Sequence, residues 1–236
     1  MLPSLLVLSL ALTPSLVSGA LFPSNSLVKW LDGKDFKKAL KANQTSVVAF
    51  VAPWCGHCQR MAPEYSKAAL GLYPLIPTYA VDCDAQKNRA ICAEQGVQGF
   101  PTIKIFPRGI DSKPVLFDGE QRTASAFYYW ATRRIPHKVK KLYHTEDIAP
   151  WVQQYKASHR ILLLNKGKTM PMLWEVLGNK YRSQLEFGHN RDRKGKTAMS
   201  LGFPKGAPKE SRVLVFPAGD DKPLLYQAQD PIKPLP

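Results

Sequence analysis

The sequence predicts an α/β fold of two tandem domains, each with a central mixed β-sheet flanked by helices. Short runs of β-branched and aromatic residues, typical of buried strands, alternate along the chain with stretches of helical spacing. The same order of elements recurs more faintly after Pro136. The 236 residues, less an apolar leader, suit two small domains that each bury a core.

The leader occupies residues 1–20, which carry no charged side chain and are dominated by Leu, Val and Ala. This composition, with small residues up to Ala20, predicts a secretory signal peptide cleaved after Ala20. A membrane anchor is the alternative, but Pro3 and Pro14 interrupt an apolar run that is shorter than the roughly 20 residues of a span. We therefore expect no membrane span and a compartment in which disulfides form.

The first domain is expected at residues 21–136. Its central feature is a buried strand that leads directly into a helix beginning at Cys55, with Pro63 as a kink inside that helix. Helices and strands alternate around it, as a compact α/β domain requires. In chain order we expect a helix at 35–41, a strand at 46–51, a helix at 55–72, a strand at 79–81, a helix at 88–95, paired strands at 102–106 and 115–117, and a helix at 124–133.

The second domain is expected at residues 137–236. Residues 189–211, rich in Gly, Lys and Arg, predict a long mobile loop. Ten residues follow Tyr226 and three of them are Pro, so we expect a domain that is either capped differently or truncated before its final helix. The other elements expected are a helix at 148–155, a strand at 160–164, a helix at 171–180, and strands at 184–187, 212–216 and 224–226.

The formal net charge of +15 limits the classes of partner. Nucleic acid is excluded by the secretory leader and by the lack of any nucleic-acid-binding motif. Acidic proteins and lipid headgroups remain, beside the simpler interpretation of a solvated surface, since most cations are scattered. The dense cluster is Arg191, Arg193, Lys194 and Lys196.

All four cysteines lie in the first domain, so only this domain can perform thiol chemistry. Cys55 and Cys58 are three residues apart at the start of a helix and can form a small redox-active disulfide ring. The helix N-terminus offers unpaired amide hydrogens and the positive end of the dipole, which stabilise a thiolate. We predict that Cys55 is the nucleophile and that Cys58 is the resolving thiol, which attacks the mixed disulfide and releases the substrate.

His57 lies between these cysteines. A partial positive charge on its ring would stabilise the thiolate further and make the pair more oxidising, whereas the alternative is a surface histidine without a role. A zinc site would need another pair of Cys or His ligands at matching spacing, and the sequence has none. We therefore expect no metal and no cofactor.

Residues 52–58 are Ala-Pro-Trp-Cys-Gly-His-Cys, residues 61–65 are Met-Ala-Pro-Glu-Tyr, and residues 99–106 are Gly-Phe-Pro-Thr-Ile-Lys-Ile-Phe. Together they closely resemble the protein disulfide isomerase family. The resemblance implies a thioredoxin domain with a Cys-Gly-His-Cys centre that includes Gly56. It also implies a redox-inactive thioredoxin-like second domain, as in short fungal-type lumenal members.

The same resemblance implies further site residues. Pro101 would be a cis-proline that faces the disulfide and presents backbone to the substrate. Arg122 would modulate the acidity of the second cysteine, although one additional residue separates it from Gly119 and a surface arginine is the alternative. The buried glutamate that the family commonly has six residues before the first cysteine is replaced by Ala49. We therefore expect slow deprotonation of Cys58.

Two covalent features are expected outside the redox pair. The spacing of Cys83 and Cys92 resembles that of a subset of lumenal family members, which implies a structural disulfide, and two buried free thiols are the alternative. Asn43-Gln44-Thr45 is an N-glycosylation sequon in the loop before the central strand, so Asn43 is a candidate glycan site.

These observations predict an enzyme, a protein disulfide isomerase or thiol–disulfide oxidoreductase of the endoplasmic reticulum lumen. Its expected partners are unfolded or disulfide-containing secretory proteins and an acidic lumenal chaperone or oxidase. No retrieval tetrapeptide follows, so this location rests on the resemblance. The alternative is a client- or chaperone-binding module with slow redox turnover. A general reductase is a third hypothesis, which His57 disfavours because Pro is usual there.

Overall fold

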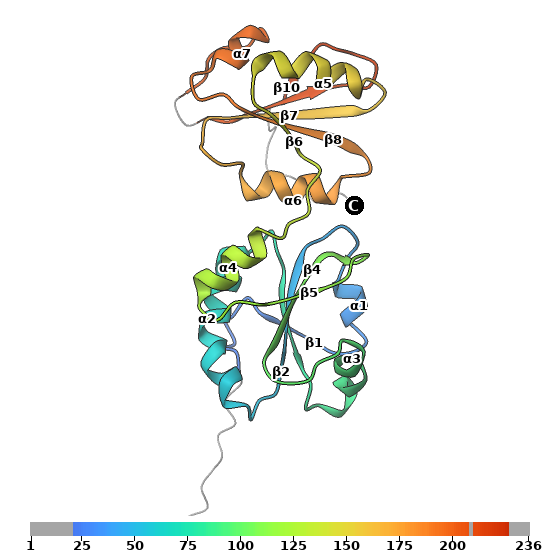
Figure 1. Cartoon of the computed structure of the whole chain (residues 1–236), viewed down its shortest axis with the longest axis vertical. Coiled ribbons are helices and arrows are strands. Elements are labelled where there is room, and N and C mark those ends of the chain that lie inside the picture. The colour runs from blue at the N-terminus through green and yellow to red at the C-terminus, as the bar shows by residue number, and fades with distance from the viewer. Residues whose placement is uncertain (1–20, 208–209, 227–236) are drawn as a thin grey trace, which may run out of the picture.

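The computed structural model describes residues 21–207 and 210–226, which form two α/β units placed end to end along the long axis of the molecule (Figure 1). The expected signal peptide at residues 1–20 lies outside the described residues. Each unit contains one five-stranded sheet with both parallel and antiparallel pairs. The predicted class, two tandem domains with mixed sheets flanked by helices, is confirmed.

The first sheet is centred on β2 (Ser46–Val51). On one side β3 (Thr78–Asp82) pairs with it in parallel, and β1 (Lys29–Leu31) adds to β3 in parallel. On the other side β4 (Thr102–Ile110) is antiparallel to β2, and β5 (Val115–Leu116) is antiparallel to β4. The strand that leads to the cysteine pair is therefore held by neighbours on both edges.

Helices cover both faces of this sheet (Figure 1). On one face lie α2 (Gly56–Leu72) and α4 (Ala124–Thr132). On the other lie α1 (Phe36–Ala39) and α3 (Arg89–Glu94), the latter preceded by the 3-10 turn η1 (Gln86–Asn88). The cysteine pair therefore lies at the start of a helix that packs on one face of the sheet.

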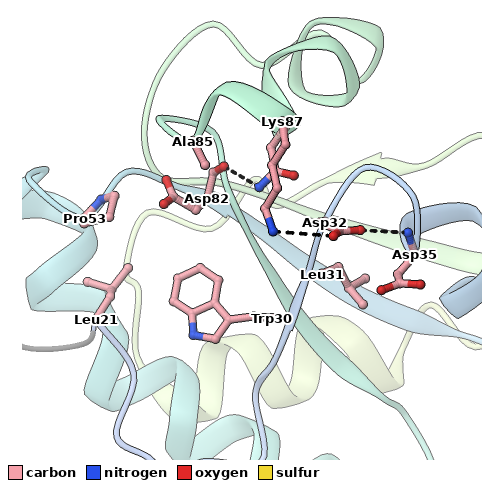
Figure 2. A pocket seen from close by; sticks show the side chains of 10 residues that line it. Leu21, Trp30, Leu31, Asp32, Asp35, Pro53, Asp82, Ala85 and Lys87 are labelled. Atoms are coloured by element: carbon pink, nitrogen blue, oxygen red, sulfur yellow. Dashed lines mark hydrogen bonds and ion pairs between the residues drawn. The ribbon is translucent and has the colours of Figure 1, made fainter.

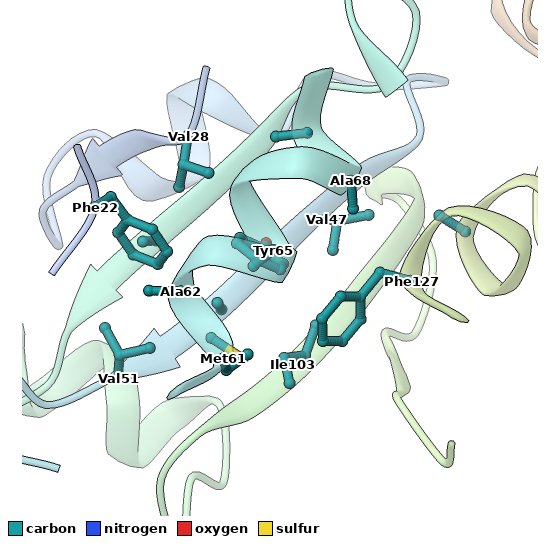
Figure 3. Close-up of a cluster of buried hydrophobic side chains, with 14 of the residues drawn as sticks. Phe22, Val28, Val47, Val51, Met61, Ala62, Tyr65, Ala68, Ile103 and Phe127 are labelled. Atoms are coloured by element: carbon teal, nitrogen blue, oxygen red, sulfur yellow. The ribbon is translucent and has the colours of Figure 1, made fainter. Parts of the chain in front are cut away.

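The alternation of side chains along β2 explains this layering. Val47, Ala49 and Val51 face the cluster under α2 and α4, which Figure 3 shows around Tyr65. Val48 and Phe50 face the opposite cluster, under α1 and α3. All six residues of β2 are buried, and all but the first are apolar, as is typical of a strand that is covered on both faces.

Two hydrogen bonds fix the position of α2. The Tyr65 hydroxyl, buried beneath the helix, donates to the carbonyl oxygen of Tyr79 on β3 (3.0 Å). On the other side of the helix, the N–H of Ala124 at the start of α4 donates to the Glu64 carboxylate (2.9 Å). The helix that carries the redox cysteines is thereby tied to both the sheet and α4.

The second sheet repeats the topology of the first, with β7 (His159–Asn165) in the place of β2. Its parallel neighbour is β8 (Leu185–Arg191), and β6 (Lys140–Leu142) pairs with β8 in parallel. Its antiparallel neighbour is β9 (Arg212–Phe216), which pairs with β10 (Leu224–Leu225).

The helices of the second unit also lie on both faces of their sheet. The turn η2 (Thr145–Asp147) leads into α5 (Ile148–Gln154), which shares a core with α7 (Lys196–Ser200). The opposite face is covered by α6 (Met172–Lys180), which lies next to the first unit in Figure 1.

The large aromatic residues of the helices and of β8 in this unit are core residues. Trp151 is buried between α5 and the sheet, and Trp174 and Phe187 are buried together beneath α6. Leu173 of α6 is exposed. In the described part of the second unit, these three aromatic rings are therefore not available to a client.

The expectation of a long loop at residues 189–211 is wrong for its first half. β8 continues to Arg191, and α7 forms five residues later. The cause is Asp192, whose buried carboxylate accepts the N–H groups of Thr197 (3.1 Å) and Ala198 (3.0 Å). The carboxylate satisfies the first amides of α7 and holds the helix against the end of the sheet.

The two units are in direct contact through α6. The Asn179 amide donates to the carbonyl oxygens of Asn43 and Pro107, both at 3.1 Å. Met172 and Val176 pack against the hydrophobic core of the first unit. The loop that carries the glycosylation sequon therefore forms part of the contact between the units.

Candidate redox site

The turn after β2 brings the predicted redox cysteines to the start of α2. The N–H of Cys55 donates to the carbonyl oxygen of Ala52 (3.1 Å), and α2 begins at Gly56 with Cys55 as its N-cap residue. Cys55 is 8 % exposed, and Cys58, one turn further, is fully buried. Both side chains are free thiols, so the structure shows the reduced form of the pair.

The pKa of the Cys55 thiol lies below its ordinary value. Burial opposes ionisation, but the backbone N–H and the thiol of Cys58 and the backbone N–H of His57 form hydrogen bonds to the sulfur. The guanidinium of Arg60 adds a positive charge nearby. These contributions together exceed the effect of burial, as is typical of a sulfur at a helix N-terminus. Cys55 is therefore the thiol that ionises first.

Burial raises the pKa of the Cys58 thiol to about 12, and its interaction with Cys55 adds to the increase. The Ala52 backbone and the charge of Arg122 act in the opposite direction without overcoming it. Ala49, where the family commonly has a glutamate, is fully buried in the cluster beneath α2 and offers no proton acceptor in its side chain. Cys58 thus stays protonated while Cys55 ionises.

Arg60 is a site residue that the sequence analysis missed. Its Nη2 lies 2.9 Å from Nδ1 of His57. A guanidinium is only a donor, so Nδ1 is the acceptor in this contact. The guanidinium of Arg60 therefore places a positive charge near Cys55, and the tuning role expected of His57 stays a prediction. The three-residue spacing of His57 and Arg60 on α2 is the only signal in the sequence.

Replacing Arg60 by Gln should slow the alkylation of Cys55 by iodoacetamide. Below the midpoint of its pH profile we expect a rate about two- to fivefold lower than in the wild type, because an exposed charge interaction contributes about 0.5–1 kcal/mol to the thiolate. The midpoint should move to higher pH. Lys67→Gln, further along α2, is the control, and an equal decrease in both variants would show that Arg60 has no specific effect.

Pro101 lies beside the cysteine pair. The Phe100–Pro101 peptide bond is cis, and the Cys55 thiol donates to the carbonyl oxygen of Phe100 (3.5 Å). The Trp54 ring meets the Phe100 ring edge-on at a centroid distance of 6.1 Å, and Trp54 is 67 % exposed. A polypeptide joined to Cys55 would therefore meet the backbone before Pro101 and the exposed Trp54 indole.

Arg122 also lies at the pair, despite its unusual spacing from Gly119. It lines a hollow of about 250 Å³ together with His57, Arg60, Met61 and Glu120. The two guanidinium groups of Arg60 and Arg122 outnumber the one carboxylate, that of Glu120, so the hollow carries positive charge next to the sulfurs. Arg122 and Arg60 thus act on different thiols, since the former lowers the pKa of Cys58 and the latter that of Cys55.

A second hollow, of about 390 Å³, lies on the side of Pro53, two residues before Cys55 (Figure 2). Its wall combines Trp30, which is 44 % exposed, with several acidic groups. Asp32 is paired there with Lys87 (3.5 Å). The redox turn is therefore flanked by one basic and one largely acidic hollow, which the sequence did not predict.

Cys83 and Cys92 form a disulfide that joins the end of β3 to α3. Both belong to the buried cluster under α1 and α3, whereas Cys55 and Cys58 belong to the cluster under α2. The N–H of Cys83 donates to the carbonyl oxygen of Val51 (2.8 Å). The disulfide lies across the sheet from the redox pair and cannot exchange with it directly.

Comparisons with known proteins agree with this geometry. Residues 27–131 match the thioredoxin family model. A thioredoxin domain-containing protein of Schizosaccharomyces pombe, named as mitochondrial, is 37% identical over 190 residues, covering 77% of this chain and 51% of the relative. Protein disulfide-isomerase MPD1 of Saccharomyces cerevisiae is 32% identical over 167 residues, covering 64% and 52%. The chain spans about half the length of these two relatives.

Among solved structures, ERdj5 form II has a similar fold, with a TM-score of 0.50 and 20% sequence identity. The match covers 87% of this chain and 28% of that chain. It therefore extends over both units and shows a likeness of fold alone.

Proposed function

Because the chain belongs to the protein disulfide isomerase family of the thioredoxin superfamily, we propose that it is a thiol–disulfide oxidoreductase that forms and rearranges disulfides in secretory proteins. The observation that supports this most is the opposite perturbation of two adjacent thiols. The pKa of Cys55 is lowered and that of Cys58 is raised to about 12. Cys55 is therefore the thiol that ionises and attacks, whereas Cys58 stays protonated until the mixed disulfide has formed.

In the reducing direction, the Cys55 thiolate attacks one sulfur of a substrate disulfide. A mixed disulfide forms, and the other substrate sulfur leaves as a thiolate that takes up a proton. Cys58 then loses its proton and attacks the Cys55 sulfur, which forms the Cys55–Cys58 disulfide and releases the second substrate thiolate. Oxidation of a substrate dithiol is the reverse sequence, and isomerisation occurs when another substrate thiol displaces Cys55 first.

Reactivation of scrambled ribonuclease and reduction of insulin by the full chain test the proposal. We expect both reactions to be accelerated and the reduction potential of the pair to lie near about −180 mV, as in protein disulfide isomerase, rather than near about −270 mV, as in thioredoxin. The chain alkylated with iodoacetamide is the control. A potential near the lower value, with insulin reduction but no ribonuclease reactivation, would indicate a general reductase instead.

Removing the charge of Arg122 should prolong the mixed disulfide. Arg122→Gln takes away the charge that lowers the pKa of Cys58, so a smaller fraction of Cys58 is ionised at any pH below its pKa. We expect release of a peptide substrate to slow by about two- to tenfold while the first attack by Cys55 changes little. Rapid-quench kinetics with a cysteine-containing peptide separate the two steps. Equal slowing of both steps would contradict the assignment.

A second function is favoured by the environment of Cys58. With its pKa raised to about 12 and an alanine at position 49, release of the substrate depends on a thiol that ionises rarely. A client-binding module with slow redox turnover would have this property. It predicts that mixed disulfides accumulate in the wild-type chain during turnover, which gel electrophoresis after acid trapping can measure.

We also propose that the chain acts in the endoplasmic reticulum lumen, although the Schizosaccharomyces pombe relative is named as mitochondrial. In the described residues, no helix is long and apolar enough to cross a membrane. Glycosylation of Asn43 would report entry into the secretory pathway. The Thr45 hydroxyl is buried and donates to the carbonyl oxygen of Pro107 (2.8 Å), so the glycan would be added before the units pack.

Digestion of the expressed protein with endoglycosidase H tests both proposals. A mobility shift that Asn43→Gln abolishes would place the chain in the endoplasmic reticulum and assign the glycan. Recovery of the unglycosylated chain in the mitochondrial fraction would contradict the location.

A further inference from the structure

We propose that the second unit binds an extended acidic segment of a partner protein in a basic groove at the carboxyl ends of β6, β7 and β8. The inference concerns residues remote in sequence from the cysteines and does not depend on the proposed redox function. The basic groove is lined by six cationic side chains, which are Lys141, Lys168, Arg191, Arg193, Lys194 and Lys196.

The groove consists of two adjoining hollows. The larger, of about 890 Å³, extends from the end of β6 to the loop after β7 and includes Lys141, Lys168 and Met170. The smaller, of about 360 Å³, continues toward α7 and includes Lys194 and Lys196. The two hollows share four wall residues, Tyr143, His144, Arg191 and Arg193. The walls run from β6 and the loop after β7 to α7, and the two volumes together exceed what a single small anion would fill, so they suit a segment of polypeptide.

The charges in the groove are unbalanced. All six cationic residues are exposed, and within residues 21–207 and 210–226 none of them forms an ion pair with a carboxylate. The carboxylate of Asp192, which also lines the groove, is occupied by the amides of α7. Glu146 and Glu175 are the remaining acidic side chains of the two walls. A ligand with several negative charges would meet an excess of free cations.

His189 supports a ligand in the groove independently of the charges. It lies in the wall of the larger hollow, is only 8 % exposed, and its Nε2 atom is buried without a hydrogen-bond partner among the described residues. Buried polar atoms of this kind are rare in native proteins because each one lowers stability. Since the ring lines the hollow, a rotation that turns Nε2 toward it would let a carboxylate or a peptide group of a ligand become its partner.

The remaining wall residues fit a polypeptide. Tyr143 is 76 % exposed and, with Met170, gives the groove apolar surface for side chains between acidic residues. The groove ends beside α7, in the unit that does not carry the cysteines (Figure 1). A partner held there would leave Cys55 accessible to a substrate.

Fluorescence anisotropy with the full chain tests the proposal. The probe is a fluorescein-labelled twelve-residue peptide that alternates Glu and Gly, and the same peptide with Gln in place of Glu is the reference. We expect the Glu peptide to bind, and Arg191→Glu combined with Arg193→Glu to weaken its affinity at least tenfold. The control is Lys34→Glu combined with Lys113→Glu, two exposed lysines of the first unit, which changes the net charge equally. It should change the affinity less than twofold.

Equal losses in the two double variants, or no loss in the groove variant, would overturn the proposal in favour of diffuse attraction to a basic protein. Displacement of the peptide by inorganic phosphate, but not by sodium chloride of equal ionic strength, would also overturn it by indicating a small-anion site. Thermal unfolding confirms that the variants fold. Insulin reduction, measured in parallel, should be unchanged in the groove variant, so failure of the groove and failure of the redox function are distinguishable.

Discussion

Replacing Cys55 by Ser is expected to lower the rate of insulin reduction by at least about a thousandfold, because it removes the nucleophile on which every later step depends. A serine hydroxyl does not ionise near neutral pH and cannot form a disulfide. The hydrogen bonds and the charge of Arg60 that lower the pKa of the Cys55 thiol have no comparable effect on it. The residual rate should equal that of the uncatalysed reaction, which the dithiol reductant alone provides.

Cys58→Ser is the matched control for this prediction. It leaves the attacking thiol in place and removes only the resolving one, so the variant should still react with a disulfide substrate. The mixed disulfide should then persist, visible as a covalent adduct by mass spectrometry of the intact chain, whereas Cys55→Ser should give no adduct. An adduct on Cys55→Ser would mean that Cys58 attacks first, in conflict with its burial and raised pKa.

The chemistry of the pair could be read from spacing alone, but its electrostatics could not. Two cysteines three residues apart at a helix start define which sulfur meets the free amides, so the roles of Cys55 and Cys58 follow from local geometry. The contact between Arg60 and His57 depends on which rotamers two exposed side chains adopt, and a sequence does not fix that choice. The place of Arg122 depends on how the chain after β5 returns to α2.

The same distinction applies to the fold. Both ends of β2 were predicted correctly, because a strand that is buried on both faces consists of an uninterrupted run of apolar residues. β1 and β6 were missed because each has only three residues and is defined by pairing with a distant strand. The loop expected at residues 189–211 was wrong because one buried carboxylate, Asp192, organises a helix in a polar stretch. These short elements form because of contacts with residues distant in the sequence, and the periodicity of the local sequence does not predict such contacts.

Arg160 is another residue whose position depends on partners distant in the sequence. Nothing near it in the sequence predicts that an arginine would be fully buried. Its Nη1 donates to the carbonyl oxygens of Val152 (3.1 Å) and Tyr155 (3.3 Å), at the C-terminal end of α5. Its Nη2 donates to those of Pro217 (2.7 Å) and Asp220 (2.6 Å), after β9. One guanidinium therefore joins a helix end to the loop that follows a strand, and the carbonyl dipoles balance its charge.

Arg160→Met should consequently lower the free energy of unfolding of the second unit by about 3–5 kcal/mol. Methionine retains much of the buried apolar stem, so the loss comes mainly from four carbonyl oxygens that lose a charged donor, each leaving a buried acceptor that costs about 1–3 kcal/mol if it finds no other partner. Arg193→Met, at an exposed arginine of the same unit, should change the value by less than about 0.5 kcal/mol. Urea unfolding followed by tryptophan fluorescence measures both, because Trp151 and Trp174 are buried in this unit. Equal midpoints for the two variants would mean that water replaces the guanidinium at these carbonyls, and that the end of α5 holds its place by apolar packing alone.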